Sequence, residues 1–136
     1  MFDHEPEWTE SAESTEVHGA KRSERLDVYR AALDFVVLAE DAIQHLPRGR
    51  SHLADQLHRA AVSIVLNIAE GAGKFSKPDK RRFYVIARGS ATECAAIFDI
   101  LLRFSAVLAD AQADAKKKLV RIASMLIKLA KSLEAS

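Results

Sequence analysis

The residues with most scope for chemistry are six cations clustered in the middle of the chain: Lys74, Lys77, Lys80, Arg81, Arg82 and Arg88. A single acid, Asp79, lies among them, and Phe75 and Tyr84 add aromatic surface. A helix predicted to begin after Ser76 would add free backbone N–H groups and a partial positive charge. Together these groups favour binding of a large anion, such as the phosphates of RNA or DNA. The same composition also suits a solvated corner that only maintains solubility, and both interpretations stay open.

Candidate catalytic and metal-binding sets are sparse. Asp55 and His58 share one helical turn with His52 just before them, but a di-metal bundle needs paired Glu-x-x-His motifs on facing helices. Cys94 lies among apolar residues and is interpreted as a core residue, not a nucleophile. The chain has no P-loop, GxGxxG or GxSxG motif. We therefore expect a protein that is not an enzyme, with no catalytic residue, no metal and no cofactor.

Four polar residues lie close to predicted apolar faces: Asn67, Glu70, Ser90 and Glu93. Buried polar groups need hydrogen-bond or ionic partners. We therefore expect Glu70 and Glu93 each to pair with an arginine, such as Arg59 or Arg88, or to cap backbone groups where two helices meet. A structural role is favoured over an acid–base pair.

The elements that must position these residues belong to one helical domain. The chain has 136 residues, of which 49% are hydrophobic, and 5 Gly and 3 Pro leave little room for a many-stranded fold. Residues 1–20 contain six acids and no Lys or Arg, whereas the rest holds 20 basic and 13 acidic side chains, a net charge of +7. We expect a disordered acidic arm over residues 1–23 and a bundle domain over residues 24–136. The basic domain indicates an anionic partner.

Apolar residues recur at helical spacing in four segments, which predicts helices over about residues 24–45, 51–71, 77–107 and 110–133. Ser51 and Ser76 are predicted N-caps, and glycines at positions 49, 71 and 73 mark breaks between helices. The third helix has a broad apolar face with these members: Phe83, Ile86, Ala87, Ala91, Cys94, Ile97, Phe98, Leu101 and Leu102. Four helices with short links predict an all-α, antiparallel up-down-up-down four-helix bundle.

The second helix is apolar around most of its circumference, because it also carries Val62, Val65, Leu66 and Ala69. Such a helix must be buried on more than one side. We therefore expect a homo-oligomer, although a helix placed deep inside a monomer would explain the same pattern. Gly89 inside the third helix costs about 1 kcal/mol relative to Ala, which indicates a packing reason for it.

The chain is expected to be soluble and cytoplasmic. Its one cysteine cannot form an internal disulfide, and the N-terminus lacks the basic and apolar regions of a signal peptide. The longest apolar run, residues 60–69, is far shorter than the roughly 20 residues needed to span a bilayer.

Three segments together resemble the four-helix bundle protein family, whose members include proteins encoded in intervening sequences of bacterial 23S ribosomal RNA genes. They read SIVLNIAEG (63–71), SKPDKRRF (76–83) and ARGSATE (87–93), and the resemblance extends over residues 26–133. The positions that match the family's signature are Asn67, Glu70, Gly71, Ser76, Asp79, Phe83, Gly89, Ser90 and Glu93. The resemblance implies that most of them determine the fold.

The resemblance further implies a protomer that assembles into a homopentameric ring, with no catalytic residue. A related protein is the accessory variability protein of diversity-generating retroelements, a basic pentamer that binds a reverse transcriptase and nucleic acid. These motifs do not distinguish the two kinds of protein.

The sequence thus predicts a non-enzymatic homo-oligomer, expected to be a pentamer, that binds structured RNA or DNA through the basic corner of residues 74–88, with the last predicted helix as a secondary contributor. The alternative is a protein-interaction scaffold or an accessory subunit of a larger enzyme, such as a reverse transcriptase.

Overall fold

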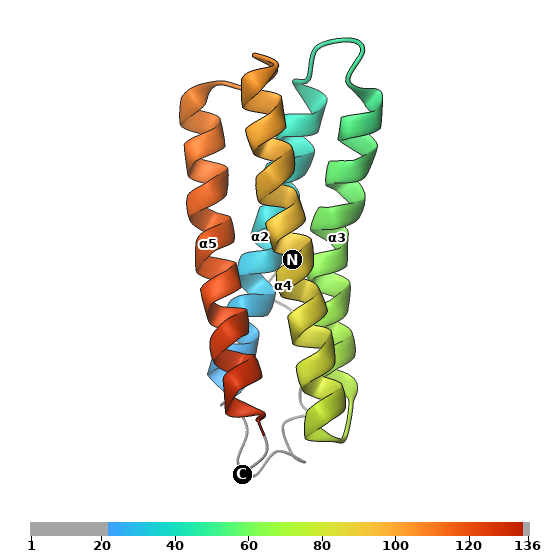
Figure 1. Cartoon of the computed structure of the whole chain (residues 1–136), viewed down its shortest axis with the longest axis vertical. Coiled ribbons are helices and arrows are strands. Elements are labelled where there is room, and N and C mark those ends of the chain that lie inside the picture. Colours follow the sequence, from blue (N-terminus) through green and yellow to red (C-terminus); the bar gives the residue numbers. More distant parts are fainter. Residues whose placement is uncertain (1–21, 135–136) are drawn as a thin grey trace.

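The computed structural model describes residues 22–134, which form four helices and no strand. The helices are α2 (Arg22–Gln44), α3 (Ser51–Gly73), α4 (Lys77–Arg103) and α5 (Ala109–Ser132). Successive helices run antiparallel, and α2 and α4 each contact both α3 and α5 (Figure 1). The predicted all-α, antiparallel four-helix bundle is confirmed. None of these helices is long and apolar enough to cross a membrane.

The ends of the helices differ from the predicted ones where local signals were weak or misleading. The predicted acidic arm lies outside the described residues, except that Arg22 and Ser23 begin α2. Ser51 is the first residue of α3 and not its cap; the cap position is Arg50, whose side chain makes no capping bond. Ser76 is the N-cap of α4, as predicted, and its Oγ accepts a hydrogen bond from the Asp79 backbone N–H at 3.2 Å.

Helix α4 ends at Arg103, earlier than predicted, because a tight turn reverses the chain there. Ser105 adopts a left-handed conformation with φ 56°. Its N–H donates to the Leu102 carbonyl, and the Ala106 N–H donates to the Leu101 carbonyl at 2.8 Å. These two bonds form a Schellman motif, which satisfies carbonyls that the helix end leaves unpaired. Glycine usually occupies this left-handed position, so the serine gave no signal in the sequence that the helix ends there.

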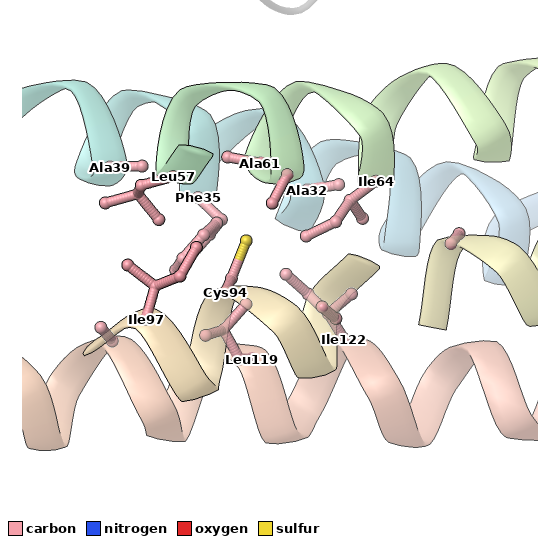
Figure 2. Packing of buried hydrophobic residues seen from close by; sticks show 14 of the residues in the cluster. Ala32, Phe35, Ala39, Leu57, Ala61, Ile64, Cys94, Ile97, Leu119 and Ile122 are labelled. Atoms are coloured by element: carbon pink, nitrogen blue, oxygen red, sulfur yellow. The ribbon is translucent and has the colours of Figure 1, made fainter. Parts of the chain in front are cut away.

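The core lies along the bundle axis and takes side chains from all four helices. Figure 2 shows Phe35 from α2, Leu57 from α3, Cys94 from α4 and Leu119 from α5 converging on one another. Phe35 meets Phe98 of α4 edge to face, with ring centroids 6.2 Å apart.

The inner face of α4 is rotated relative to the predicted one. Phe83 is half-buried and Ile86 is 42% exposed, so both were wrongly assigned to the core. Lys80 and Tyr84, each 1% exposed, occupy the inner positions two turns and one turn before Ala87, respectively. Residues four and seven apart share a helix face, so Lys80 continues the buried stripe.

Candidate nucleic-acid interface

The six cations predicted to form one anion-binding corner do not share a single surface. Lys80 is buried, and its Nζ donates a hydrogen bond to the Ala72 carbonyl at 3.0 Å. Ala72 lies in the last turn of α3, where carbonyl groups lack partners within the helix. The ammonium group of Lys80 therefore caps α3 from the interior and does not face a surface ligand. We remove Lys80 from the interface.

A close contact between α3 and α4 accompanies this buried lysine. Gly71 is buried, and a Cβ added there would lie 2.8 Å from Tyr84 Cε1 and 3.2 Å from the Lys80 carbonyl oxygen. Gly71 was predicted to end α3, but the helix continues to Gly73. The role of Gly71 is therefore to let the Tyr84 ring lie close to the α3 backbone. Tyr84 is 1% exposed and borders a groove only, so its ring does not form the open aromatic surface that the sequence suggested. Phe75, in the turn between the helices, is 85% exposed, as the sequence suggested.

Two of the cations flank a ring on the α3 side of α4. Lys74 Nζ lies 5.2 Å and the Arg82 guanidinium 4.5 Å from the centroid of the Phe83 ring. Such cation–π contacts contribute about 0.5–1 kcal/mol at exposed sites. Lys74 also pairs with Glu70 at 3.7 Å. The charges on this side are thus partly occupied by contacts within the chain.

Arg81 and Arg88 lie on the other side of α4, where they line a groove shared with α5. The groove has a volume of about 280 Å³, and Val85, Ile127 and Lys131 also line it. Arg81 forms a long ion pair with Glu134 at 3.8 Å. The first turns of α4 and the last turns of α5 lie at the same end of the bundle (Figure 1). We call these residues the α4–α5 groove.

Helix α5 extends this positive surface along the bundle. Between positions 115 and 133 the chain has six cations and no acid. Three of these cations pair with acids of the same chain: Lys116 with Asp99, Lys118 with Asp114, and Lys128 with Glu24. The other three are exposed and form no ion pair with any described residue: Lys117, Arg121 and Lys131.

The sequence analysis treated α5 as a secondary contributor to the corner. It did not recognise how much of the exposed positive charge α5 carries. The signal that could have revealed it is the acid-free run over residues 115–133, because a cation within such a run has few partners along its own helix. Lys117 and Lys131 stand 14 residues apart, which corresponds to about 21 Å along the helix. That length exceeds what one small anion would occupy.

The candidate catalytic and metal-binding residues do not gather in one site within residues 22–134. No group of three or more His, Cys, Asp or Glu among them could hold a metal ion. His58 Nδ1 lies 2.5 Å from Glu40 Oε1, a contact that joins α3 to α2. Burial, together with the charge of Glu93, raises the pKa of the Cys94 thiol to about 12. That thiol stays protonated at neutral pH and is no nucleophile.

A larger hollow of about 560 Å³ lies near the opposite end of the bundle. Its floor includes Phe98, and its rim includes Asp41, His45 and Asp114. His45 Nδ1 bonds the Asp41 backbone carbonyl at 2.8 Å, and Asp114 pairs with Lys118. The polar groups on the rim are therefore engaged locally and do not form an acid–base set aimed into the hollow.

Comparison with known proteins identifies the family. The model of the 23S rRNA-intervening sequence protein family matches residues 24–128, which include most of the bundle. The chain belongs to this family. A crystal structure of a protein of unknown function from the S23 ribosomal protein family of Bacteroides thetaiotaomicron has a TM-score of 0.74. Its sequence identity is 22%, over 79% of this chain and 98% of that one, so the likeness establishes the fold alone. A search among curated proteins finds no significant match.

The positions by which the chain resembles the 23S rRNA-intervening sequence protein family include polar residues between α3 and α4. Asn67 Nδ2 donates to the carbonyl and the Oγ of Ser63, at 2.8 and 3.0 Å. Ser63 Oγ and Ser90 Oγ share a hydrogen bond of 2.8 Å. These contacts tie the two helices together. The expected arginine pairs are wrong: Glu70 pairs with Lys74, and Glu93 is exposed without an ion pair to any described residue.

Proposed function

We propose that this protein assembles into a homopentamer that binds structured RNA or DNA through cations of α4 and α5, without catalysing a reaction. The observation that carries the proposal is that four exposed cations on the α4–α5 side have no ion-pair partner among the described residues: Arg88, Lys117, Arg121 and Lys131. Such side chains can exchange small counterions for phosphates at little electrostatic cost.

The identity and spacing of these cations suit a polyanion. Arg81 and Arg88 are seven residues apart, so they stand two turns apart on one face of α4, about 10.5 Å along its axis. Guanidinium groups bind phosphate oxygens through two parallel hydrogen bonds. The α5 cations continue the surface beyond the groove. Phosphates repeated along a nucleic acid can contact several of these groups at once.

Exposed apolar side chains on α3 and α4 support assembly. Leu66 is 57% and Ile86 42% exposed, and Val62 and Ala69 are half-buried on the outer part of α3. Gly89 follows Ile86 by three residues, and a Cβ there would meet nothing within 4 Å among residues 22–134. The described part of the protomer thus supplies no packing reason for Gly89. Close approach of a second copy would supply it and would cover the apolar side chains.

Light scattering coupled to size-exclusion chromatography tests the assembly. Five copies of the 15.0 kDa chain have a mass of about 75 kDa. We expect that mass for the wild type and a smaller species for the Leu66→Glu/Ile86→Glu variant. Val37→Glu is the matched control, because Val37 is 62% exposed on α2, which is not adjacent to α4 in the bundle. A wild type that elutes as a monomer would remove the pentamer from the proposal.

Fluorescence anisotropy with a labelled RNA hairpin and a DNA duplex, titrated at several salt concentrations, tests nucleic-acid binding. RNA is the first probe because the family description refers to an intervening sequence of 23S rRNA. We expect binding that persists near about 150 mM salt, with log affinity falling by about 0.7–0.9 per log unit of salt for each phosphate contacted. Binding confined to low salt would refute the nucleic-acid role and leave the basic surface to dock an acidic partner protein.

A further inference from the structure

We propose that the α4–α5 groove holds one unpaired nucleotide of the bound RNA, with its base on the apolar floor and its flanking phosphates on the cations at the rim. This inference rests on the proposed function, because it names the part of an RNA that this surface takes.

The floor of the groove is apolar although it lies among cations. Val85 of α4 is 40% and Ile127 of α5 is 37% exposed, and both line the groove. Leu126, Ala130 and Tyr84 also line it, and all three are otherwise buried. A surface that only attracted phosphates would gain nothing from exposed branched side chains. A flat apolar face is what a nucleobase needs to lose its contact with water.

The rim carries the charges that such a nucleotide would need. Arg81 and Arg88 come from α4, and Lys131 comes from α5. Arg88 and Lys131 make no ion pair with a described residue. Arg81 pairs with Glu134 at 3.8 Å, and the two side chains are 44% and 60% exposed, so water screens this pair. A phosphate can replace Glu134 as the partner of Arg81.

The size of the groove selects an unpaired base. Its volume of about 280 Å³ is below that of most pockets for drug-sized ligands. Bases within an RNA duplex are stacked and face away from the backbone, so they cannot reach the floor. Bases in loops and bulges can turn outward and lie on apolar side chains or on guanidinium planes.

An acidic peptide is the competing occupant, and the charges beyond the groove argue against it. Arg121 and Lys117 continue the row of unpaired cations along α5, about 21 Å from Lys131 to Lys117. A single acidic residue with an apolar neighbour would fill the groove and leave those cations unused. A nucleic acid carries a phosphate at every step and can engage them all.

The test compares two labelled RNA hairpins of the same sequence, one with a fully paired stem and one with a single bulged uridine. The Val85→Ala/Ile127→Ala variant keeps every charge and removes apolar atoms from the floor of the groove. We expect wild type to prefer the bulged hairpin, and the variant to lose about tenfold in affinity for it. Affinity for the paired hairpin and both salt slopes should stay unchanged. Val120→Ala is the matched control, because Val120 is 63% exposed on α5 outside the groove.

The outcomes separate this inference from the proposed function. Equal binding of the two hairpins by the wild type would overturn the nucleotide site and leave electrostatic binding intact. Absence of binding to either hairpin would overturn both. Binding of a labelled acidic peptide that the variant loses, with RNA binding retained, would assign the groove to a protein partner. Should Val85→Ala/Ile127→Ala melt early, Val85→Thr/Ile127→Thr keeps the branched shape, makes the floor polar and is expected to lose the same preference.

Discussion

Replacing Lys80 should destabilise the fold without removing a nucleic-acid contact. Its side chain is 1% exposed, and its Nζ bonds the Ala72 carbonyl at the end of α3. Lys80→Ala deletes three methylene groups and the ammonium. The lost burial corresponds to about 2 kcal/mol. The lost hydrogen bond from a charged donor adds about 1.5–3 kcal/mol, so we expect a cost of about 4 kcal/mol.

A loss of this size is a large part of the 5–15 kcal/mol that usually stabilises a domain. Urea denaturation followed by circular dichroism measures it, at one fixed protein concentration because assembly would shift the midpoint. Lys80→Met separates the two contributions, since it keeps the apolar stem and removes the ammonium group together with its bond to Ala72. We expect it to cost about 1.5–3 kcal/mol. Lys77→Met removes the same charge from a half-buried position with no ion pair and should cost less than about 0.5 kcal/mol.

RNA binding by the same variants decides between a buried and an exposed role. If Lys80 is a structural cap, folded Lys80→Met binds the RNA hairpin no more weakly than Lys77→Met does. A Lys80→Met protein that is as stable as the wild type but binds RNA several-fold more weakly would refute this reasoning, because it would place the ammonium on the surface.

Two glycines should respond oppositely to alanine, and one acid should give a pH-dependent contribution. Gly71→Ala places a methyl group 2.8 Å from Tyr84 Cε1 and should cost about 1–3 kcal/mol in urea denaturation. Gly89→Ala should stabilise the protomer by about 1 kcal/mol yet weaken assembly, as measured by denaturation of a monomeric variant and by light scattering of the full assembly. Hydrogen bonds from Lys116 and Gln112 lower the pKa of Asp99, so its contribution is present above about pH 4 and is lost as pH falls through the lowered value. The urea midpoints of wild type and Asp99→Asn should therefore converge in acid; a constant difference would contradict the pairing.

The helices and their order could be predicted because apolar side chains recur along each one with helical spacing. The Ser76 cap could also be predicted from the sequence, because Ser, Pro and Asp at the start of α4 each favour the beginning of a helix. The end of α4 could not be predicted, because Ser105 adopts a left-handed conformation that glycine usually adopts.

The candidate interface was harder to predict because charge pairing and burial depend on neighbouring helices. Helix α4 is apolar over a wide arc, so spacing alone did not show which of two adjacent stripes faces inward. Lysine is rarely buried, which made Lys80 look like a surface cation. Which lysines of α5 remain unpaired depends on acids far away in sequence, such as Asp99 beside Lys116 and Glu24 beside Lys128.

The central claim is that nucleic acid binds the α4–α5 side and not the α3 side of α4. Two variants that each remove two positive charges test it. The groove variant is Arg81→Gln/Arg88→Gln. The corner variant is Lys74→Gln/Arg82→Gln, at the two cations that flank the Phe83 ring. Equal changes in net charge mean that any difference between them reports where the phosphates bind.

RNA affinity of these two variants as a function of salt is the measurement that tests this claim most directly. We expect the groove variant to bind more than about tenfold more weakly near about 150 mM salt and to lower the salt slope by roughly two. The corner variant should keep most of the affinity and of the slope. The reverse order, or equal losses in the two variants, would contradict the α4–α5 interface.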